Sequence, residues 1–307
     1  MVEGPGTPSD RGTPGGRRPA GPEPTTARSP ARSTARSDRI LAAPPVLDFI
    51  DFTGKTVLVT GGTRGVGRGI ARAFLDAGAG VAVCGRHEPD PEELPRSKHS
   101  TTALFVRADL RDPEQAAAAV DTAAAELGSI DVLVNNAGGS PPRAAAESSP
   151  RFVSAVVELN LLAPFWCAQA ANAIMQRQSQ GGSIVNIGSV SGQRQSPGTA
   201  IYGAAKAGLS NLTKSLAVEW APKVRVNCVV AGLLGTEAAE EHYGGAERIR
   251  AVAASVPLGR LGTPADVAAM CLFLASPFAG YVTGADFVLH GGDGRPAFML
   301  AVEGDGK

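Results

Sequence analysis

The chain has 307 residues, 43% of them hydrophobic, and its 29 Lys and Arg residues balance its 29 Asp and Glu residues. A chain of this length buries a large core, so composition allows one large α/β domain or two smaller ones. The charge balance gives no general attraction to nucleic acid or to an anionic membrane surface, and we expect neither as a partner. The longest purely apolar run, residues 267–275, is far shorter than the roughly 20 residues that span a bilayer. We therefore expect a soluble protein with a small-molecule ligand.

The cysteines and histidines are scattered along the chain. Cys84, Cys167, Cys228 and Cys271 lie in mostly apolar segments, with no C-x-x-C pair and no histidine at the spacing of a metal ligand. This pattern predicts buried, reduced thiols in a cytoplasmic protein, and no metal site.

Residues 1–45 differ in kind from the rest. They are built of Pro, Gly, Ser, Thr, Ala and Arg, with almost no large apolar side chains and no apolar stretch like that of a secretory signal. Such a segment cannot bury enough surface to offset the entropy lost on ordering. We expect a disordered tail at 1–45 and one folded domain at 46–307.

From residue 50 onward, short apolar runs alternate with stretches that have helical patterns. Strands are expected at 56–60, 80–85, 102–110, 130–138, 182–189, 224–230 and 285–291. Helices are expected at 67–78, 112–128, 150–178, 200–221 and 263–275, the second with Asp112 as its cap and Pro113 in its first turn. Strands that are buried on both faces and alternate with helices predict a single doubly wound parallel sheet of about seven strands, with helices on both faces.

A glycine-rich turn joins the first strand to the first helix. Gly61, Gly65 and Gly67 let the backbone approach a pyrophosphate, which the amides and the positive end of the helix dipole then hold. A glycine-rich turn alone is weak evidence and is often only structural. The order of strand, turn and helix favours dinucleotide binding.

The end of the second strand bears on which nicotinamide cofactor is used. An acidic residue there binds the ribose hydroxyls of NAD and repels a 2′-phosphate, but this chain has Gly85 followed by Arg86. Arg64, in the glycine turn, is a second cation for the same phosphate. The alternative is that both arginines are solvated loop residues. The pattern favours NADP(H), with NAD(H) as the alternative.

The stretch IYGAAKAGLS places Tyr202 and Lys206 four residues apart, on one face of a helix. A tyrosine that exchanges protons near neutral pH needs its pKa of about 10 lowered by about three units, of which one nearby cation supplies about 1 to 3. Ser189, at the end of the fifth strand, lies at the sheet edge where ligands bind. Taken singly, each residue is more often structural. Their combination favours chemistry at a carbonyl oxygen.

With these motifs the chain resembles the short-chain dehydrogenase/reductase (SDR) family over residues 50–295. The matching pieces are TGGTRGVG, the NNAG of 135–138, Asn160 in VELNLL, Ser189, the YGAAK of 202–206 and GYVTGADFVLHGG. The resemblance implies that Tyr202 exchanges a proton with the substrate oxygen. It also implies that Lys206 lowers the pKa of Tyr202 and binds the nicotinamide ribose, that Ser189 orients the substrate, and that Asn160 holds a water that relays protons.

The resemblance also implies cofactor contacts, with Asp109 at the adenine and Asn136 at the adenosine ribose. The full set of expected cofactor residues is Gly61, Thr63, Arg64, Gly65, Val66, Gly67, Arg86, Asp109, Leu110, Asn136, Tyr202, Lys206, Leu234 and Thr236. One departure is Ala231, which stands where the family usually has proline after the sixth strand. Without the fixed backbone angle of proline, the loop over the nicotinamide is expected to be looser.

By resemblance, the expected reaction is hydride transfer between a nicotinamide and a ketone or secondary alcohol, since the three-residue spacing of Tyr and Lys differs from that of the enoyl reductases of this fold. Residues 233–260 are expected to form a substrate lid, in which His242 and Tyr243 either contact substrate or are plain lid surface. A homo-oligomer, tetramer or dimer, is expected through the helices at 150–178 and 200–221. The rival hypothesis is a cofactor-binding sensor or assembly partner without turnover, against which the intact Ser, Tyr and Lys argue.

Overall fold

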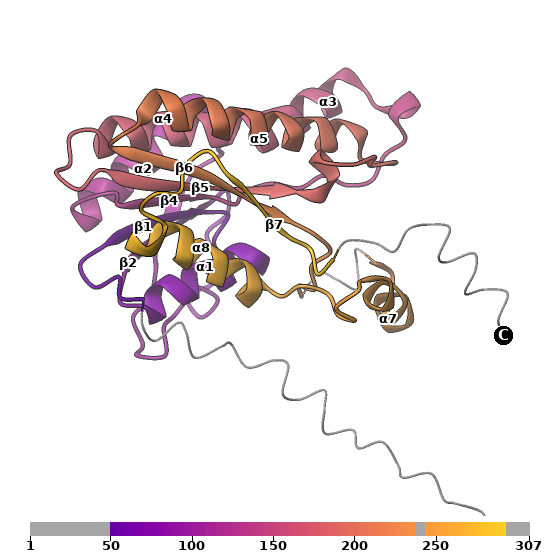
Figure 1. The fold of residues 1–307 in the computed structure, drawn as a ribbon, viewed down its shortest axis with the longest axis horizontal. Coiled ribbons are helices and arrows are strands. Elements are labelled where there is room, and N and C mark those ends of the chain that lie inside the picture. Colours follow the sequence, from indigo (N-terminus) through magenta and orange to yellow (C-terminus); the bar gives the residue numbers. More distant parts are fainter. Residues whose placement is uncertain (1–49, 238–242, 293–307) are drawn as a thin grey trace, which may run out of the picture. The chain divides into compact units, whose positions relative to one another are not determined.

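The computed structural model describes residues 50–237 and 243–292, so the expected tail and His242 lie outside the described residues. Within that part of the chain, a seven-stranded parallel sheet has the order β3-β2-β1-β4-β5-β6-β7 (Figure 1). The strands are β1 (Thr56–Thr60), β2 (Gly80–Gly85), β3 (Leu104–Arg107), β4 (Val132–Asn135), β5 (Gly182–Ser189), β6 (Val224–Ala231) and β7 (Asp286–Leu289). The prediction of a doubly wound parallel sheet is confirmed. The strand order reverses between β1 and β4, which is where such sheets bind ligands.

Helices cover both faces of the sheet. The main helices are α1 (Gly65–Asp76), α2 (Pro113–Leu127), α3 (Pro150–Val157), α4 (Ala163–Met175), α5 (Ala200–Trp220), α7 (Ala246–Ser255) and α8 (Pro264–Ala275). Helices α1 and α8 lie on one face, and α2, α4 and α5 on the other (Figure 1). Because successive side chains of a strand point to opposite faces, Val57 and Val59 of β1 join the core beside α1 and α8, whereas Leu58 joins the core on the other face.

The helix ends follow from local sequence. Asp112 caps α2 by accepting hydrogen bonds from the backbone amides of Glu114 and Gln115, with Pro113 in the first turn, as predicted. Thr263 and Asp266 form a reciprocal capping box at the start of α8. These caps fix where the helices begin, and so set the lengths of the connections that reach the sheet edges.

The stretch predicted as one helix at 150–178 is interrupted. Between α3 and α4 the backbone forms a π-helical turn, Glu158–Leu162, which no pattern in the sequence indicated. The whole stretch Pro150–Met175 is long and apolar enough, by length and composition, to cross a membrane. Cys167, Ala171 and Met175 are nevertheless buried in the core beside the sheet, which is the packing expected of a core helix.

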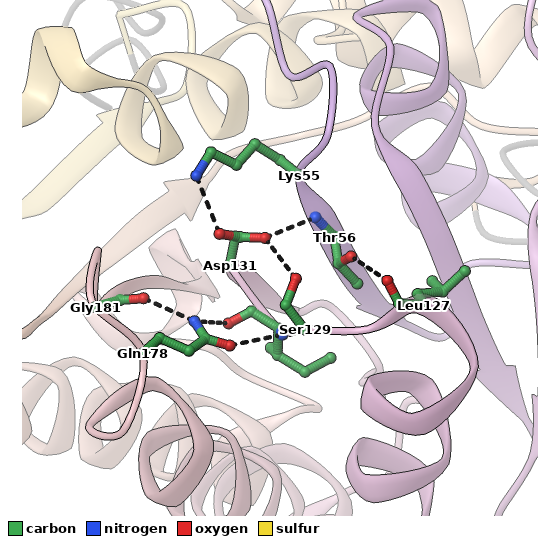
Figure 2. A network of polar contacts seen from close by, with 8 residues as sticks. Lys55, Thr56, Leu127, Ser129, Asp131, Gln178 and Gly181 are labelled. Atoms are coloured by element: carbon green, nitrogen blue, oxygen red, sulfur yellow. Dashed lines mark hydrogen bonds and ion pairs between the residues drawn. The ribbon is translucent and has the colours of Figure 1, made fainter.

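Polar contacts tie together the amino ends of the central strands (Figure 2). Asp131, just before β4, accepts a hydrogen bond from the backbone amide of Thr56 at 2.9 Å and pairs with Lys55 Nζ at 3.2 Å. The side chain of Gln178, after α4, binds both the N–H and the C=O of Ile130. These anchoring contacts lie at the amino ends of the strands. The residues expected to carry chemistry follow the carboxyl ends.

Candidate active site

Segments that follow β1 and β4 meet at the carboxyl edge of the sheet. The hydroxyl of Thr60, the last residue of β1, accepts hydrogen bonds from the backbone amides of Asn136 and Ala137, both at 2.9 Å. The Nδ2 group of Asn136 donates to the carbonyls of Thr60 at 2.9 Å and Gly61 at 3.3 Å. The loop after β4 therefore holds the glycine turn in place, and Asn136 has this structural role whatever contact it makes with a cofactor ribose.

The glycine turn is a cradle that side chains would fill. Gly61 and Gly65 have φ values of +63° and +55°, in the left-handed region that glycine tolerates. A Cβ on Gly67 would lie 2.3 Å from the carbonyl oxygen of Gly61 and 2.5 Å from Asn136 Nδ2. Helix α1 begins at Gly65, and the residue before it, Arg64, provides no side-chain cap. The turn thus fits the pyrophosphate of a dinucleotide, because its backbone carries no side chains that would keep the phosphates away from the start of α1.

Ser189 and Tyr202 come together from different elements. Ser189 ends β5 and accepts a hydrogen bond from the backbone amide of Ser191 at 3.2 Å. Tyr202 lies in the first turn of α5, where burial raises the pKa of its phenol and a hydrogen bond with Ser189 opposes that rise. The hydroxyls of Ser189 and Tyr202, which the sequence singled out, therefore lie near each other at the carboxyl edge of the sheet.

Lys206 lies one turn beyond Tyr202 and is buried, with 4% of its surface exposed. Its Nζ donates to the carbonyl oxygen of Ile187 in β5 at 2.8 Å and lies 5.8 Å from the centroid of the Tyr202 ring. Burial lowers the pKa of Lys206 to about 8. An amine with this pKa can both release and accept a proton near neutral pH.

One expectation from the sequence is wrong for this arrangement. We expected Lys206 to bring the pKa of Tyr202 below its usual value, but burial of the phenol dominates and the pKa is raised. The ammonium group is hydrogen-bonded to Ile187 and lies over the face of the tyrosine ring. At neutral pH, Tyr202 is therefore protonated.

Asn160 lies on the π-helical turn and is fully buried. Its Oδ1 accepts from the amide of Gly139 at 2.8 Å, and its Nδ2 donates to the carbonyls of Gly139 and Val156, each at 2.9 Å. A Cβ on the neighbouring Gly138 would lie 2.8 Å from Asn160 Oδ1 and 3.2 Å from Lys206 Nζ. The structure therefore brings Asn160 and Lys206 together next to Gly138. The water-holding role implied for Asn160 stays a prediction.

Two cationic residues lie at the phosphate end of the site. Arg86 is exposed just after β2, and Arg64 is exposed at the start of α1. A Cβ on Gly85 would lie 3.9 Å from the hydroxyl of Thr63, so the glycine turn borders the end of β2. Val66, next in the turn, packs its side chain partly against the core. The two side chains expected to contact the 2′-phosphate are therefore both exposed to solvent.

The expected adenine contacts are more constrained than the sequence showed. The carboxylate of Asp109 is held by Arg111, whose Nε donates to it at 2.9 Å. This hydrogen bond holds the pKa of Asp109 below its usual range, and the nearby charge of Arg86 adds to the effect. The side chain of Leu110 is buried in the core, 5% exposed, which leaves its backbone as the part able to face a cofactor.

The segment after β6 returns to the glycine turn. Ala231 is the last residue of β6, in register with Ser189 of β5 and Leu289 of β7, so the sheet continues to the position where the family usually has proline. Leu234 forms a bridge to Gly262. The hydroxyl of Tyr243 donates to the carbonyl of Leu234 at 3.3 Å, a contact within the expected lid.

The methyl group of Thr236 lies 3.9 Å from the position of a Cβ on Gly65, which places this expected cofactor residue beside the turn. The next residue, Glu237, accepts a hydrogen bond from the backbone amide of Gly65 at 3.0 Å. Sequence reasoning missed Glu237. No signal pointed to it, because an exposed glutamate in a polar connection has no distinguishing pattern.

A cavity of about 300 Å³ lies beside the start of α5. Its lining includes Arg143 from the loop after β4, Phe152 from α3, and Ile201, which precedes Tyr202. The backbone amide of Arg143 donates to the carbonyl of Gly198 at 2.7 Å and so ties the loops after β4 and β5 together. None of the four candidate catalytic residues lines this cavity, which flanks the segment that carries Tyr202.

The cysteines are all buried and unpaired. Burial raises the pKa of Cys84 and of Cys228 to about 12, so both are neutral thiols at physiological pH. Among residues 50–237 and 243–292, no three His, Cys, Asp or Glu side chains gather as metal ligands would.

Comparisons with known proteins show which family the chain is similar to. A family model described as enoyl-(acyl carrier protein) reductase matches residues 61–293. The 3α-hydroxysteroid dehydrogenase of Mediterraneibacter gnavus is 37% identical, over 77% of this chain and 95% of its own. An L-rhamnose 1-dehydrogenase (NAD(P)(+)) of a Sphingomonas species is 36% identical, over 78% and 96%. The crystal structure of a short-chain type dehydrogenase/reductase from Mycobacterium marinum matches with a TM-score of 0.72 and 35% identity, over 82% of this chain and 100% of that one.

The chain belongs to the short-chain dehydrogenase/reductase family. It is therefore an oxidoreductase with a small-molecule substrate, and relatives in the SDR family use NAD(H) or NADP(H). The glycine cradle between β1 and α1 fits the pyrophosphate of such a cofactor on structural grounds alone.

The buried ammonium group of Lys206 gives a prediction about stability and pH. The pKa of Lys206 is about 8 in the folded protein, against 10.5 for an unperturbed lysine. Between these values the unfolded chain binds more protons, so this residue makes the free energy of unfolding rise with pH, by up to about 1.4 kcal/mol per pH unit. Urea denaturation of the wild type and of Lys206→Met, from about pH 7 to 10, should show that rise in the wild type relative to the variant.

The matched control is Lys98→Met, which removes an exposed lysine. Its free energy of unfolding should differ from that of the wild type by an amount that stays constant over the same pH range. A constant difference between the wild type and Lys206→Met would contradict the burial of the charge.

Proposed function

We propose that the protein is an NADP(H)-dependent SDR that transfers a hydride between the nicotinamide and the carbon of a ketone or secondary alcohol, with Tyr202 exchanging the proton. The observation that carries this proposal is that Ser189 lies near enough to Tyr202 to oppose the rise in its pKa, with the ammonium group of Lys206 over the tyrosine ring. Two neighbouring hydroxyls at a ligand-binding sheet edge can both reach one carbonyl oxygen.

In the reduction direction, the proposed roles follow from the protonation states. Ser189 donates a hydrogen bond to the carbonyl oxygen and holds it beside Tyr202. A nicotinamide held by the glycine turn and by Lys206 would supply the hydride that the carbonyl carbon accepts. Tyr202 is protonated at neutral pH because burial raises its pKa, so it gives its proton to the oxygen and the product is the alcohol. The charge of Lys206, 5.8 Å from the ring centroid, stabilises the phenolate that is left.

The phenolate must then regain its proton. Lys206 has a pKa of about 8 and is buried next to Tyr202, so it can return a proton without a large change in free energy. Asn160 lies next to Gly138, as the lysine does, and is held by Gly139. We propose that Asn160 positions the water through which Lys206 is reprotonated.

The cavity beside the start of α5 is our candidate for the substrate-binding site. Apolar side chains of Phe152 and Ile201 line it, and Arg143 lies at the loop that borders it. We propose that the part of the substrate remote from the carbonyl enters this cavity.

Replacement of Tyr202 by Phe tests the assignment of the proton. The variant lacks the exchanging hydroxyl, so kcat should fall by about a hundredfold to ten-thousandfold while the dissociation constant of NADPH stays close to that of the wild type. NADPH oxidation should be followed with a panel of ketones, aldehydes and quinones. The control is Tyr281→Phe, which removes an exposed hydroxyl and should leave turnover unchanged.

Undiminished turnover by Tyr202→Phe would refute the proposed role of the phenol. If the wild-type protein binds NADPH but none of the carbonyl compounds in the panel is reduced, the rival hypothesis is supported: a cofactor-binding sensor or assembly partner.

Replacement of Arg86 tests whether the protein prefers NADPH to NADH. Arg86 is exposed just after Gly85, the residue that stands where an acidic side chain would repel a 2′-phosphate. Because a charge-assisted hydrogen bond contributes about 1.5–3 kcal/mol, Arg86→Ser should weaken NADPH binding by about tenfold or more and leave NADH binding unchanged. Arg151→Ser, on the exposed side of α3, is the control. Equal losses for both cofactors, or tighter binding of NADH than of NADPH by the wild type, would contradict the assignment.

We propose that the protein is located in the cytoplasm, because its four unpaired cysteines suit a reducing compartment.

We also propose that the protein forms a homo-oligomer, a dimer or a tetramer. An apolar groove between α4 and α5 supports this, lined by Leu161, Leu162, Phe165 and Leu212, with Leu162 36% exposed. Light scattering should give a molar mass of two or four chains. A mass close to that of one chain, 31.2 kDa, would contradict the oligomer.

A further inference from the structure

The carboxylate of Glu237 is bound to the glycine turn. Its Oε1 accepts a hydrogen bond from the backbone amide of Gly65 at 3.0 Å and pairs with Arg68 Nη2 at 2.7 Å. Gly65 is the first residue of α1, whereas Glu237 lies 172 residues later, in the segment after β6. The hydrogen bond from Gly65 holds the pKa of Glu237 below its usual range, and the charges of Arg68 and Arg64 add to this effect.

These donors are the ones that a dinucleotide needs. The amides of the first turn of α1, together with the positive end of the helix dipole, form the site for the negatively charged pyrophosphate. The Gly65 amide cannot serve the carboxylate and a phosphate oxygen at full strength at once, and the two anions repel each other at this distance. The guanidinium of Arg68 already pairs with the carboxylate of Glu237, so a phosphate at the turn would compete with Glu237 for this group as well.

We propose that Glu237 competes with the cofactor's pyrophosphate for the amide of Gly65 and the guanidinium of Arg68. Cofactor binding then exchanges one anion for another. Arg68 stays paired throughout, and Glu237 leaves the turn together with the segment after β6 that carries it. This inference rests on the proposed cofactor-dependent function. It adds a residue whose charge sets the affinity for the cofactor and couples its binding to the position of Thr236.

Glu237→Gln separates competition from simple anchoring. The variant keeps the length of the side chain and an oxygen that can accept from Gly65, but it removes the charge that opposes the pyrophosphate. In this variant the hydrogen bond from Gly65 to residue 237 and the ion pair with Arg68 are weakened, so the cofactor displaces the side chain more easily. The dissociation constant of the cofactor complex should therefore fall by about three- to tenfold. The gain should be the same for NADPH and NADH, since both contain the pyrophosphate. Isothermal titration calorimetry with each cofactor measures this.

The control is Glu247→Gln, an equivalent change at an exposed position in the first turn of α7, which should leave both dissociation constants unchanged. A second readout is the melting temperature. Without added cofactor, Glu237→Gln should melt at a slightly lower temperature than the wild type, because it loses its ion pair with Arg68. A saturating concentration of NADPH should raise its melting temperature by more than that of the wild type. Glu237→Ala should show the same directions.

Unchanged or weaker cofactor binding in Glu237→Gln, together with a lower melting temperature, would show that the contact only anchors the segment, and would overturn the inference. A gain confined to NADPH would overturn it as well, because Glu237 would then act on the 2′-phosphate. These outcomes leave the proposed function standing, since the wild type binds cofactor in both. A wild type that binds neither NADPH nor NADH would overturn the proposed function and the inference together.

Discussion

The ammonium group of Lys206, buried against the backbone carbonyl of Ile187, is the constraint around which the site is arranged. A charge removed from water costs several kcal/mol unless polar groups replace its hydration. Strand β5 supplies one such group, because it continues past the end of β4, whose last residue, Asn135, is opposite Asn186. Gly138 supplies the space, since a Cβ there would approach the ammonium group to 3.2 Å. With Lys206 fixed in this way, the position of Tyr202 one helical turn earlier follows.

The amino-end and carboxyl-end edges of the sheet carry different contacts. At the amino ends, Asp131 and its partners join β1 to β4. At the carboxyl ends, the glycine turn, the loop after β4 and the segment after β6 are held by exposed or partly buried contacts, among them that of Glu237 with Gly65. Weak contacts suit an edge where a cofactor must enter and leave.

Much of this architecture could be predicted from local pattern. The bounds of β5 and the cap of α2 at Asp112 follow from apolar runs and capping chemistry, and Ser189, Tyr202 and Lys206 follow from their spacing and their place on the elements. The π-helical turn that carries Asn160 could not be predicted, because it depends on packing between helices. The pKa of Tyr202 could not be predicted either, because its direction is decided by burial and not by the neighbouring cation. The contact of Glu237 joins residues too distant in sequence for any periodicity to relate them.

A crystal structure of the protein with NADPH and a ketone that it reduces tests the central claim most directly. The account predicts that the ketone oxygen lies about 3 Å from the hydroxyls of both Ser189 and Tyr202, with Lys206 still bound to the carbonyl of Ile187. A ketone oxygen bound away from either hydroxyl, or a Tyr202 hydroxyl that points away from Ser189 while the ketone carbon faces the nicotinamide, would contradict it.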